Sequence, residues 1–327
     1  MRTTIDSYKA RAGRLDLSGI AFDDFKDEPL APDALRSLRY MHDVEHHTVC
    51  YLRDLLLTPA HQDPEITSFL SCWVFEEMWH GEAIARVLEA HGEAAGSPRI
   101  AALRHGHRRR QAMTTLSTLA SAAFAGRAFV ALHMSWGAIN EWTTQAGYAR
   151  LSEKAAHPTL RELLRRIMKQ EGSHIDFYAS EAARRLADDA KAQRLTRFAL
   201  SHWWRPVGSG VMPTSEIRFL VSYLFDGAKG ADVLERIDRR VDRLPGQGDL
   251  HLLTRAVTRL AASSRAARRV LSEPGRVGPR RATREGARGT RGGQSVGVVE
   301  GVRLLAGGQA EGRHGALGLL GPDRTRT

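Results

Sequence analysis

The sequence has little of what marks secreted or membrane-spanning proteins. Only two of its 327 residues are cysteines, Cys50 and Cys72, which argues against a disulfide scaffold and favours two small buried thiols. The N-terminus runs into charged residues without an apolar stretch, so no signal peptide is predicted. The most apolar region, about 116–134, contains Arg127 and reads as a buried helix, not a transmembrane segment. We therefore expect a cytoplasmic protein.

Aromatic residues make up 7% of the chain, and none occurs in the segment 274–327. This segment holds ten arginines against four acidic residues, together with 14 of the 30 glycines, and so carries +6 of the net charge of +11. A segment with so little to bury is expected to be disordered. Its charge can attract nucleic acid or acidic partners, but a solvated tail is the simpler interpretation, and no nucleic-acid partner is predicted.

Elsewhere the apolar residues recur with the period of an α-helix, and no alternating strand pattern is evident. An all-α fold is therefore predicted. The four longest helices are expected at 32–58, 63–91, 112–153 and 157–187, with a long link at 93–111 that suits a crossover between the second and third. Additional C-terminal helices are expected at 191–204, 214–225, 231–244 and, more weakly, 250–271. The predicted divisions are a lead-in (1–30), a helical domain (31–245), a weak terminal helix (246–273) and the tail (274–327).

Two Glu-x-x-His motifs occur in the second and fourth predicted helices, Glu77 to His80 and Glu171 to His174. Residues three apart on a helix share one face, so each carboxylate and imidazole can reach one metal ion together. Each motif follows a lone glutamate on the apolar stripe of the preceding predicted helix. These two glutamates are Glu45 and Glu141.

A glutamate on an apolar stripe needs a partner, because burying an unpaired charge is costly. Carboxylate oxygens and imidazole nitrogens together suit iron or manganese. Four glutamates and two histidines from four helices form the ligand set of carboxylate-bridged di-iron bundles. The predicted metal ligands are Glu45, Glu77, His80, Glu141, Glu171 and His174.

Several residues near the predicted ligands are candidates for roles around the metal site. Glu76 and Gln170, which precede the motif glutamates, are expected to face outward or to cap the ligand shell. Asp176 is a candidate to orient a ligand histidine. The small residues at 122–131 favour close helix packing or leave room for a substrate channel. The histidines that flank Glu45 are further candidates for contact with the ligands, namely His42, His46 and His47.

At these residues the chain resembles the ferritin-like di-iron superfamily, and within it the soluble acyl-acyl carrier protein desaturases (type 2 fatty acid desaturases). The resemblance covers about 30–245. It rests on Glu45 and on the segments Glu76-Glu77-Met78-Trp79-His80, Glu141-Trp142-Thr143-Thr144 and Glu171-Gly172-Ser173-His174. It implies a ferritin-like four-helix bundle that holds two iron ions (Fe2+/Fe3+), with Thr144 beside the oxygen-binding side as a catalytic candidate. The second family motif usually has Asp before its Glu, where this chain has Gln170.

The resemblance implies an enzyme of lipid biosynthesis, an oxidoreductase that activates dioxygen and desaturates a long acyl chain on acyl carrier protein. It also implies a homodimer and an external electron donor such as ferredoxin. The alternatives are another di-iron oxygenase or a rubrerythrin-like peroxidase, although no Cys-x-x-Cys pair is present, or a non-enzymatic iron-binding ferritin-like protein. Seven arginines form either a basic docking face for the acidic carrier or a solvated helix surface. They are Arg104, Arg108, Arg109, Arg110, Arg161, Arg165 and Arg166.

Overall fold

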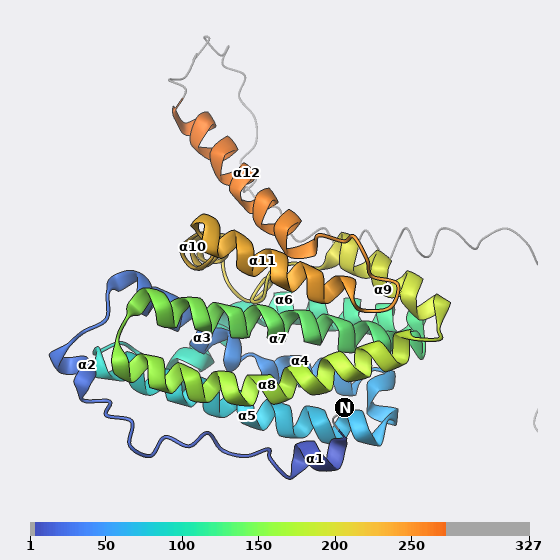
Figure 1. The fold of residues 1–327 in the computed structure, drawn as a ribbon, viewed down its shortest axis with the longest axis horizontal. Coiled ribbons are helices and arrows are strands. Elements are labelled where there is room, and N and C mark those ends of the chain that lie inside the picture. Colours follow the sequence, from blue (N-terminus) through green and yellow to red (C-terminus); the bar gives the residue numbers. More distant parts are fainter. Residues whose placement is uncertain (1–3, 273–327) are drawn as a thin grey trace, which may run out of the picture. The chain divides into compact units, whose positions relative to one another are not determined.

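The computed structural model of the chain describes residues 4–272, except for the side chains of 107–110 and 263–272. Within this part the regular secondary structure is helical (Figure 1), which confirms the all-α prediction. No helix in the described part is both long and apolar enough to cross a membrane. The expected disorder of 274–327 falls outside the described residues.

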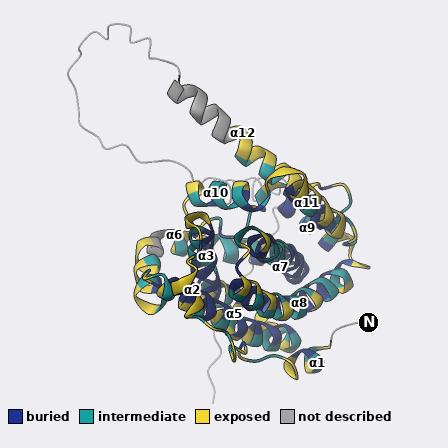
Figure 2. Ribbon diagram, turned by 60° about the vertical axis from the view of Figure 1, so that its left-hand side comes forward, coloured by how far each residue is buried: buried dark blue, intermediate teal, exposed yellow. Residues whose placement is uncertain are grey.

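Four helices pack together as the central bundle. They form two pairs, α3 with α5 and α7 with α8, and contacts of α3 with α7 and of α5 with α8 close the bundle. Their inward faces are buried (Figure 2). Their bounds are α3 Pro32–Glu45, α5 Pro64–Ala90, α7 Ala128–Ala155 and α8 Pro158–Leu186.

The bundle interior consists of two apolar clusters. Along α5, Trp73 belongs to one cluster and Ile84 to the other. Along α8, Tyr178 belongs to the first cluster and Ile167 to the second. Both Glu-x-x-His motifs lie between these positions in the sequence, so the bundle places them where the two apolar clusters meet.

Local sequence signals set the starts of two bundle helices. The Asp63 carboxylate accepts hydrogen bonds from the backbone N–H groups of Glu65 (3.0 Å) and Ile66 (3.2 Å), and Pro64 follows in the first turn. This is a regular N-cap. The helix α8 begins in the same way with the pair His157-Pro158. Both starts confirm the sequence prediction.

The prediction of one continuous helix over 32–58 is wrong. The helix α3 ends at Glu45, and a second helix, α4 (Thr48–Leu56), follows after a turn at 46–47. The break is stabilised by partners for the freed carbonyls, because the Thr48 hydroxyl donates to Glu45 O (2.6 Å) and Arg104 donates to His46 O (3.0 Å). The apolar stripe of α3 therefore ends at the break, and Val49, in the next helix, is 43% exposed.

The expected link at 93–111 is also wrong, because it is helical. The helix α6 runs from Gly96 to Ala125 without interruption. The expected third helix (112–153) is divided instead at Gly126, which has a φ of +57°, a conformation that glycine adopts most readily. The start of α6 is fixed from α3, since Gly96 N–H donates to His42 Nε2 (3.2 Å) and Arg99 holds Asp43 with two hydrogen bonds.

The remaining elements surround the bundle. The N-terminal segment lies against α5 and α8, and its side chains Tyr8, Leu15 and Phe25 are buried. The helix α9 packs on α7, and α12 contacts α10 and α11. The bounds are α1 Ile5–Lys9, α2 Asp24–Asp27, η1 Pro59–Gln62, α9 Ala190–Trp203, α10 Thr214–Leu224, α11 Gly227–Asp242 and α12 Leu252–Ser272.

Candidate metal centre

The structure brings all six predicted ligand residues together inside the bundle. They form two groups of four, in each of which one ligand atom per residue lies within 4.8 Å of the others. Both groups contain Glu77 and Glu171, so two ions, one in each group, would share these two carboxylates. The first position is the group completed by Glu45 and His80, and the second is the group completed by Glu141 and His174.

The two histidines turn the same ring nitrogen toward the shared carboxylates. Nδ1 of His80 lies 3.2 Å from Glu77 and 3.4 Å from Glu171. Nδ1 of His174 lies 3.2 Å from Glu77 and 3.1 Å from Glu171. The arrangement is nearly symmetric, because each Glu-x-x-His helix presents one glutamate and one histidine to the same point.

The cluster is buried and contains both acidic and basic side chains. Each of the six side chains belongs to a residue no more than 5% exposed. Burial and the neighbouring carboxylates raise the pKa of Glu45 and Glu141 well above the ordinary value. Burial also acts to raise the pKa of Glu77, but hydrogen bonds with Glu45 and the two histidines outweigh it and hold this pKa well below the ordinary value.

Burial shifts the pKa of a histidine in the opposite direction, because the charged form is a cation. Burial acts to lower the pKa of His80, but hydrogen bonds to Glu171 and Glu77 raise it to about 9. Four buried carboxylates thus face only two imidazoles, and the contact of Glu171 Oε1 with His80 Nδ1 is long, at 3.4 Å. Cations with oxygen and nitrogen ligands would neutralise this charge. The residues present therefore fit a pair of metal ions.

An aromatic donor holds each of the two unshared glutamates. The Trp73 indole N–H donates to Glu141 Oε1 at 3.0 Å. The Tyr148 hydroxyl donates to Glu45 Oε1. These bonds fix the orientation of the two carboxylates.

The residue that precedes each motif glutamate contacts the histidine of the other motif. His174 Nε2 lies 3.0 Å from Glu76 Oε2, and His80 Nε2 lies 3.0 Å from Gln170 Oε1. The expectation that Glu76 and Gln170 face outward is wrong, and the alternative, that they cap the ligand shell, is confirmed. Each contact leaves Nδ1 of the ring free to face the shared carboxylates.

The N-terminal segment forms the next layer. The Tyr8 hydroxyl donates to Glu76 Oε2 (2.7 Å), and the backbone N–H of Gly13 donates to Glu76 Oε1 (3.1 Å). The Gln170 amide in turn donates to Gly13 O (2.9 Å). Sequence reasoning missed Tyr8 and Gly13, because neither lies on a periodic stripe or in a motif.

Other predicted neighbours are placed less closely. Asp176 is exposed, which argues against the candidate role of orienting a ligand histidine. The ring of His46 lies against Gly81 of α5, where an added Cβ would come within 2.6 Å of His46 Nε2. Thr144 is half-buried on α7, one turn after Glu141, and its catalytic role stays a prediction.

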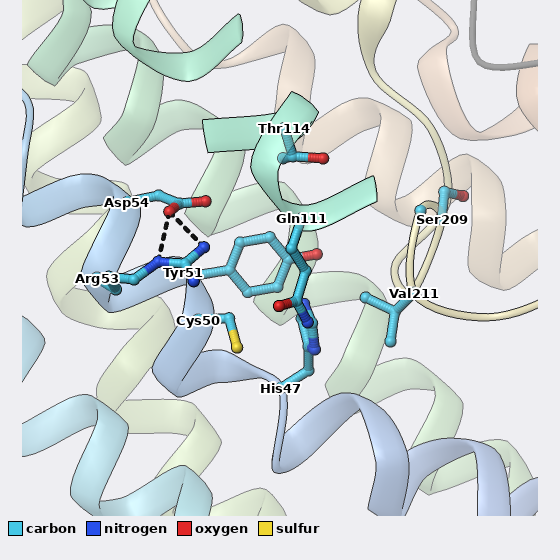
Figure 3. Close-up of a pocket in the computed structure, with 10 residues that line it drawn as sticks. His47, Cys50, Tyr51, Arg53, Asp54, Gln111, Thr114, Ser209 and Val211 are labelled. Atoms are coloured by element: carbon cyan, nitrogen blue, oxygen red, sulfur yellow. Dashed lines mark hydrogen bonds and ion pairs between the residues drawn. The ribbon is translucent and has the colours of Figure 1, made fainter. Parts of the chain in front are cut away.

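A small pocket of about 40 Å³ lies beside the break between α3 and α4 (Figure 3). It is lined by Cys50 and Tyr51 of α4, Gln111 and Thr114 of α6, and Val211 from the segment between α9 and α10. This volume holds only a few water molecules and does not accommodate a long acyl chain. An acyl substrate would need a different site.

Three of the arginines proposed for carrier docking make contacts within the chain. Arg165 and Arg166 bind Glu162 on the same helix, at 2.7 and 2.8 Å. Arg104 holds the carbonyl of His46, as described above. For these three arginines, the contacts favour a structural role or a solvated surface over docking of a carrier protein.

Comparison with known proteins adds no family assignment. No protein-family model matches the chain, and none of the curated proteins matches it either. The functional argument therefore rests on the residues of the cluster and on their geometry.

Proposed function

We propose that the cluster binds two iron ions and that the chain is a di-iron oxidoreductase. The observation that carries this proposal is the sharing of Glu77 and Glu171 by two four-residue groups. Each group has three carboxylates and one imidazole, a donor set that suits iron or manganese. A structural site for a single ion would need only one such group.

The chain's own residues supply the environment for this chemistry. Their burial excludes bulk water, which strengthens electrostatic interactions inside the site. Glu76 and Gln170 fix the two imidazole rings. Trp73 and Tyr148 fix the unshared carboxylates. When bound, two irons would supply the electrons and the open coordination positions that dioxygen activation requires.

We further propose, from the resemblance of the motifs, that the substrate is a long acyl chain on acyl carrier protein. Desaturation removes two hydrogen atoms from neighbouring carbons. With one dioxygen, two electrons from an external donor and two protons, it yields the double bond and two molecules of water. Thr144, one turn from Glu141, is the candidate to act beside the reacting oxygen.

The first experiment loads the purified chain anaerobically with ferrous iron, measures bound iron, and then records the optical spectrum on mixing with oxygen. Two irons per chain and an oxygen-dependent spectral change are expected. A chain that binds no iron contradicts the proposed site. Glu162→Ala, on the outer side of α8, serves as the matched control for substitutions of the cluster glutamates.

The second experiment adds a reductant and acyl carrier protein substrates and analyses the acyl chains by mass spectrometry. Loss of two mass units is expected. If iron binds and reacts with oxygen but no desaturated or hydroxylated acyl chain forms, the acyl substrate is contradicted while the di-iron centre stands. Consumption of hydrogen peroxide without acyl product would favour the peroxidase alternative.

A further inference from the structure

The two metal positions differ in what lies behind their histidines. At the second position, His174 Nε2 meets a carboxylate oxygen of Glu76 at 3.0 Å. At the first position, His80 Nε2 meets an amide oxygen of Gln170, also at 3.0 Å. The two contacts are equal in length and equivalent in their place in the motif, but one acceptor is an acid and the other is an amide.

The orientation of the Gln170 amide is fixed by its other contacts. Its Nε2 donates to Gly13 O at 2.9 Å and to Glu76 Oε1 at 3.2 Å. Because both donors point away from His80, Oε1 is the atom that faces the imidazole. The His80 ring therefore donates its Nε2–H to a neutral acceptor, whereas the His174 ring donates to an acidic one.

A carboxylate that accepts from the far nitrogen of an imidazole raises the basicity of the ligating nitrogen more than an amide does, since hydrogen bonds with an ionised partner are the stronger ones. His174 is thus the better electron donor of the two. A second observation points the same way. Glu141 lies within the continuous helix α7, whereas Glu45 is the last residue of α3, so the second position is the more pre-organised.

We infer that the chain fills its two metal positions in order. The position completed by Glu141 and His174 binds its ion first and tightly, and the position completed by Glu45 and His80 binds its ion second and more weakly. This inference rests on the proposed function, because it assumes that the cluster holds two ions. It goes beyond that function in assigning different affinities to the two positions.

The unshared glutamates allow each position to be tested alone. Glu45→Ala removes a ligand of the first position only, and Glu141→Ala removes a ligand of the second position only. Each variant would be titrated anaerobically with Co2+ and, separately, with Fe2+ by isothermal calorimetry. Changes behind a metal ligand typically alter affinity about 10–100-fold. We expect the ion that remains in Glu45→Ala to bind at least tenfold more tightly than the ion that remains in Glu141→Ala.

Exchanging the acid and the amide tests the cause. In the double variant Glu76→Gln/Gln170→Glu the carboxylate lies behind His80, so the difference between Glu45→Ala and Glu141→Ala should shrink or reverse. Glu89→Gln, at an exposed position of the same helix α5, is the matched control and should leave the difference unchanged. Circular dichroism verifies that each variant retains its helices, and the comparison of Glu45→Ala with Glu141→Ala remains decisive if the exchange variant does not fold.

Equal affinities in Glu45→Ala and Glu141→Ala would overturn the inference, and so would tighter binding in Glu141→Ala. A difference that the exchange leaves untouched would overturn the assignment of its cause to Glu76 and Gln170. In all of these outcomes the unaltered chain still binds two ions, and the proposed function stands. Binding of no metal by the unaltered chain would instead contradict the proposed function itself.

Discussion

The helices α3 and α7 carry the two unshared glutamates, and they differ in how they hold them. Glu141 lies well inside α7, which continues to Ala155. Glu45 is the final residue of α3, and the chain turns at His46 before α4 begins. The same residue type on the same kind of apolar stripe therefore lies within a continuous helix in one case and at a helix end in the other.

The contacts around Glu45 compensate for the missing helix beyond it. Tyr148 donates to its carboxylate, and Arg104 holds the carbonyl of His46. Two residues before Glu45, Asp43 forms a paired contact with Arg99 of α6 at 2.7 and 2.6 Å. The backbone at Glu45 thus depends on tertiary contacts, whereas the backbone at Glu141 is held by the helix on both sides.

The largest expected effect comes from removing what the two positions share. Glu171→Ala removes a shared carboxylate from both four-residue groups. Both ions should therefore be lost, the one beside Glu45 of α3 as well as the one beside Glu141 of α7. Metal content of the purified variant, measured by mass spectrometry, checks this, and Glu162→Ala is the control. Two ions retained in Glu171→Ala would mean that the carboxylate does not bridge. Helix content should not fall, because the substitution also removes a buried charge.

The second-largest expected effect is the loss of thermal stability on metal removal. A ligand present at 1,000 times its dissociation constant stabilises the folded state by about 4 kcal/mol. For a domain of this size each kcal/mol shifts the melting temperature by about 2–4 °C. We expect the chelated protein to melt about 10 °C lower than the iron-loaded protein in scanning calorimetry. Identical melting curves would show that the cluster tolerates its charges without cations.

A smaller effect is expected from substitutions at two glycines, of which only one packs against the end of α3. Gly81 follows His80 and packs on the His46 ring at the end of α3. Gly172 follows Glu171, and an added Cβ there meets only Gln145 Nε2, at 3.9 Å. Gly81→Ala should cost about 1–3 kcal/mol through overpacking and weaken metal binding at the Glu45 position.

Gly172→Ala should be neutral or stabilise by about 0.5–1 kcal/mol, because alanine suits a helix interior better than glycine. Chemical denaturation followed by circular dichroism measures both variants. Equal stabilities for Gly81→Ala and Gly172→Ala would contradict the importance of the contact between His46 and α5.

The smallest expected effect concerns the aromatic donors. Tyr148→Phe deletes the hydrogen bond to Glu45, and Trp73→Phe deletes the bond to Glu141. A typical hydrogen bond contributes about 0.5–1.5 kcal/mol net. Because Glu45 lacks a continuing helix, Tyr148→Phe should weaken its ion more than Trp73→Phe weakens the other. Calorimetric titration with Co2+ resolves the two steps, and an equal loss would argue that the helix end is as rigid as α7.

Helical periodicity predicted that four helices carry the six residues of the cluster, because ligands three residues apart and apolar stripes are local patterns. The predicted bounds were wrong for the first and third of these helices, which are α3 and α7. Helical periodicity could not predict the break after Glu45. The residues His46 and His47 are compatible with a helix, and the partners that stabilise the turn come from Arg104 on α6. The first part of α6, at 96–111, was predicted as a link because glycine and proline often interrupt helices. In the structure Gly96 and Pro98 lie in the first turn of the helix.

The layer behind the histidines was only partly visible in the sequence. The position before each motif glutamate gave a local signal for Glu76 and Gln170. Their crossed pairing with the opposite histidine depends on how α5 packs against α8. Tyr8 carries no such signal, since it reaches Glu76 across 68 residues of chain.

The contacts of Gly13 have a consequence for how the site would be mapped by mutation. Its N–H and its carbonyl are both main-chain atoms, and an added Cβ would meet nothing within 4 Å. An alanine scan would therefore score this residue as silent, although it holds Glu76 and Gln170 together. Only proline, which removes the N–H, or a deletion would reveal it. Amide hydrogen exchange at Gly13 would report the state of the metal site from a position that mutagenesis overlooks.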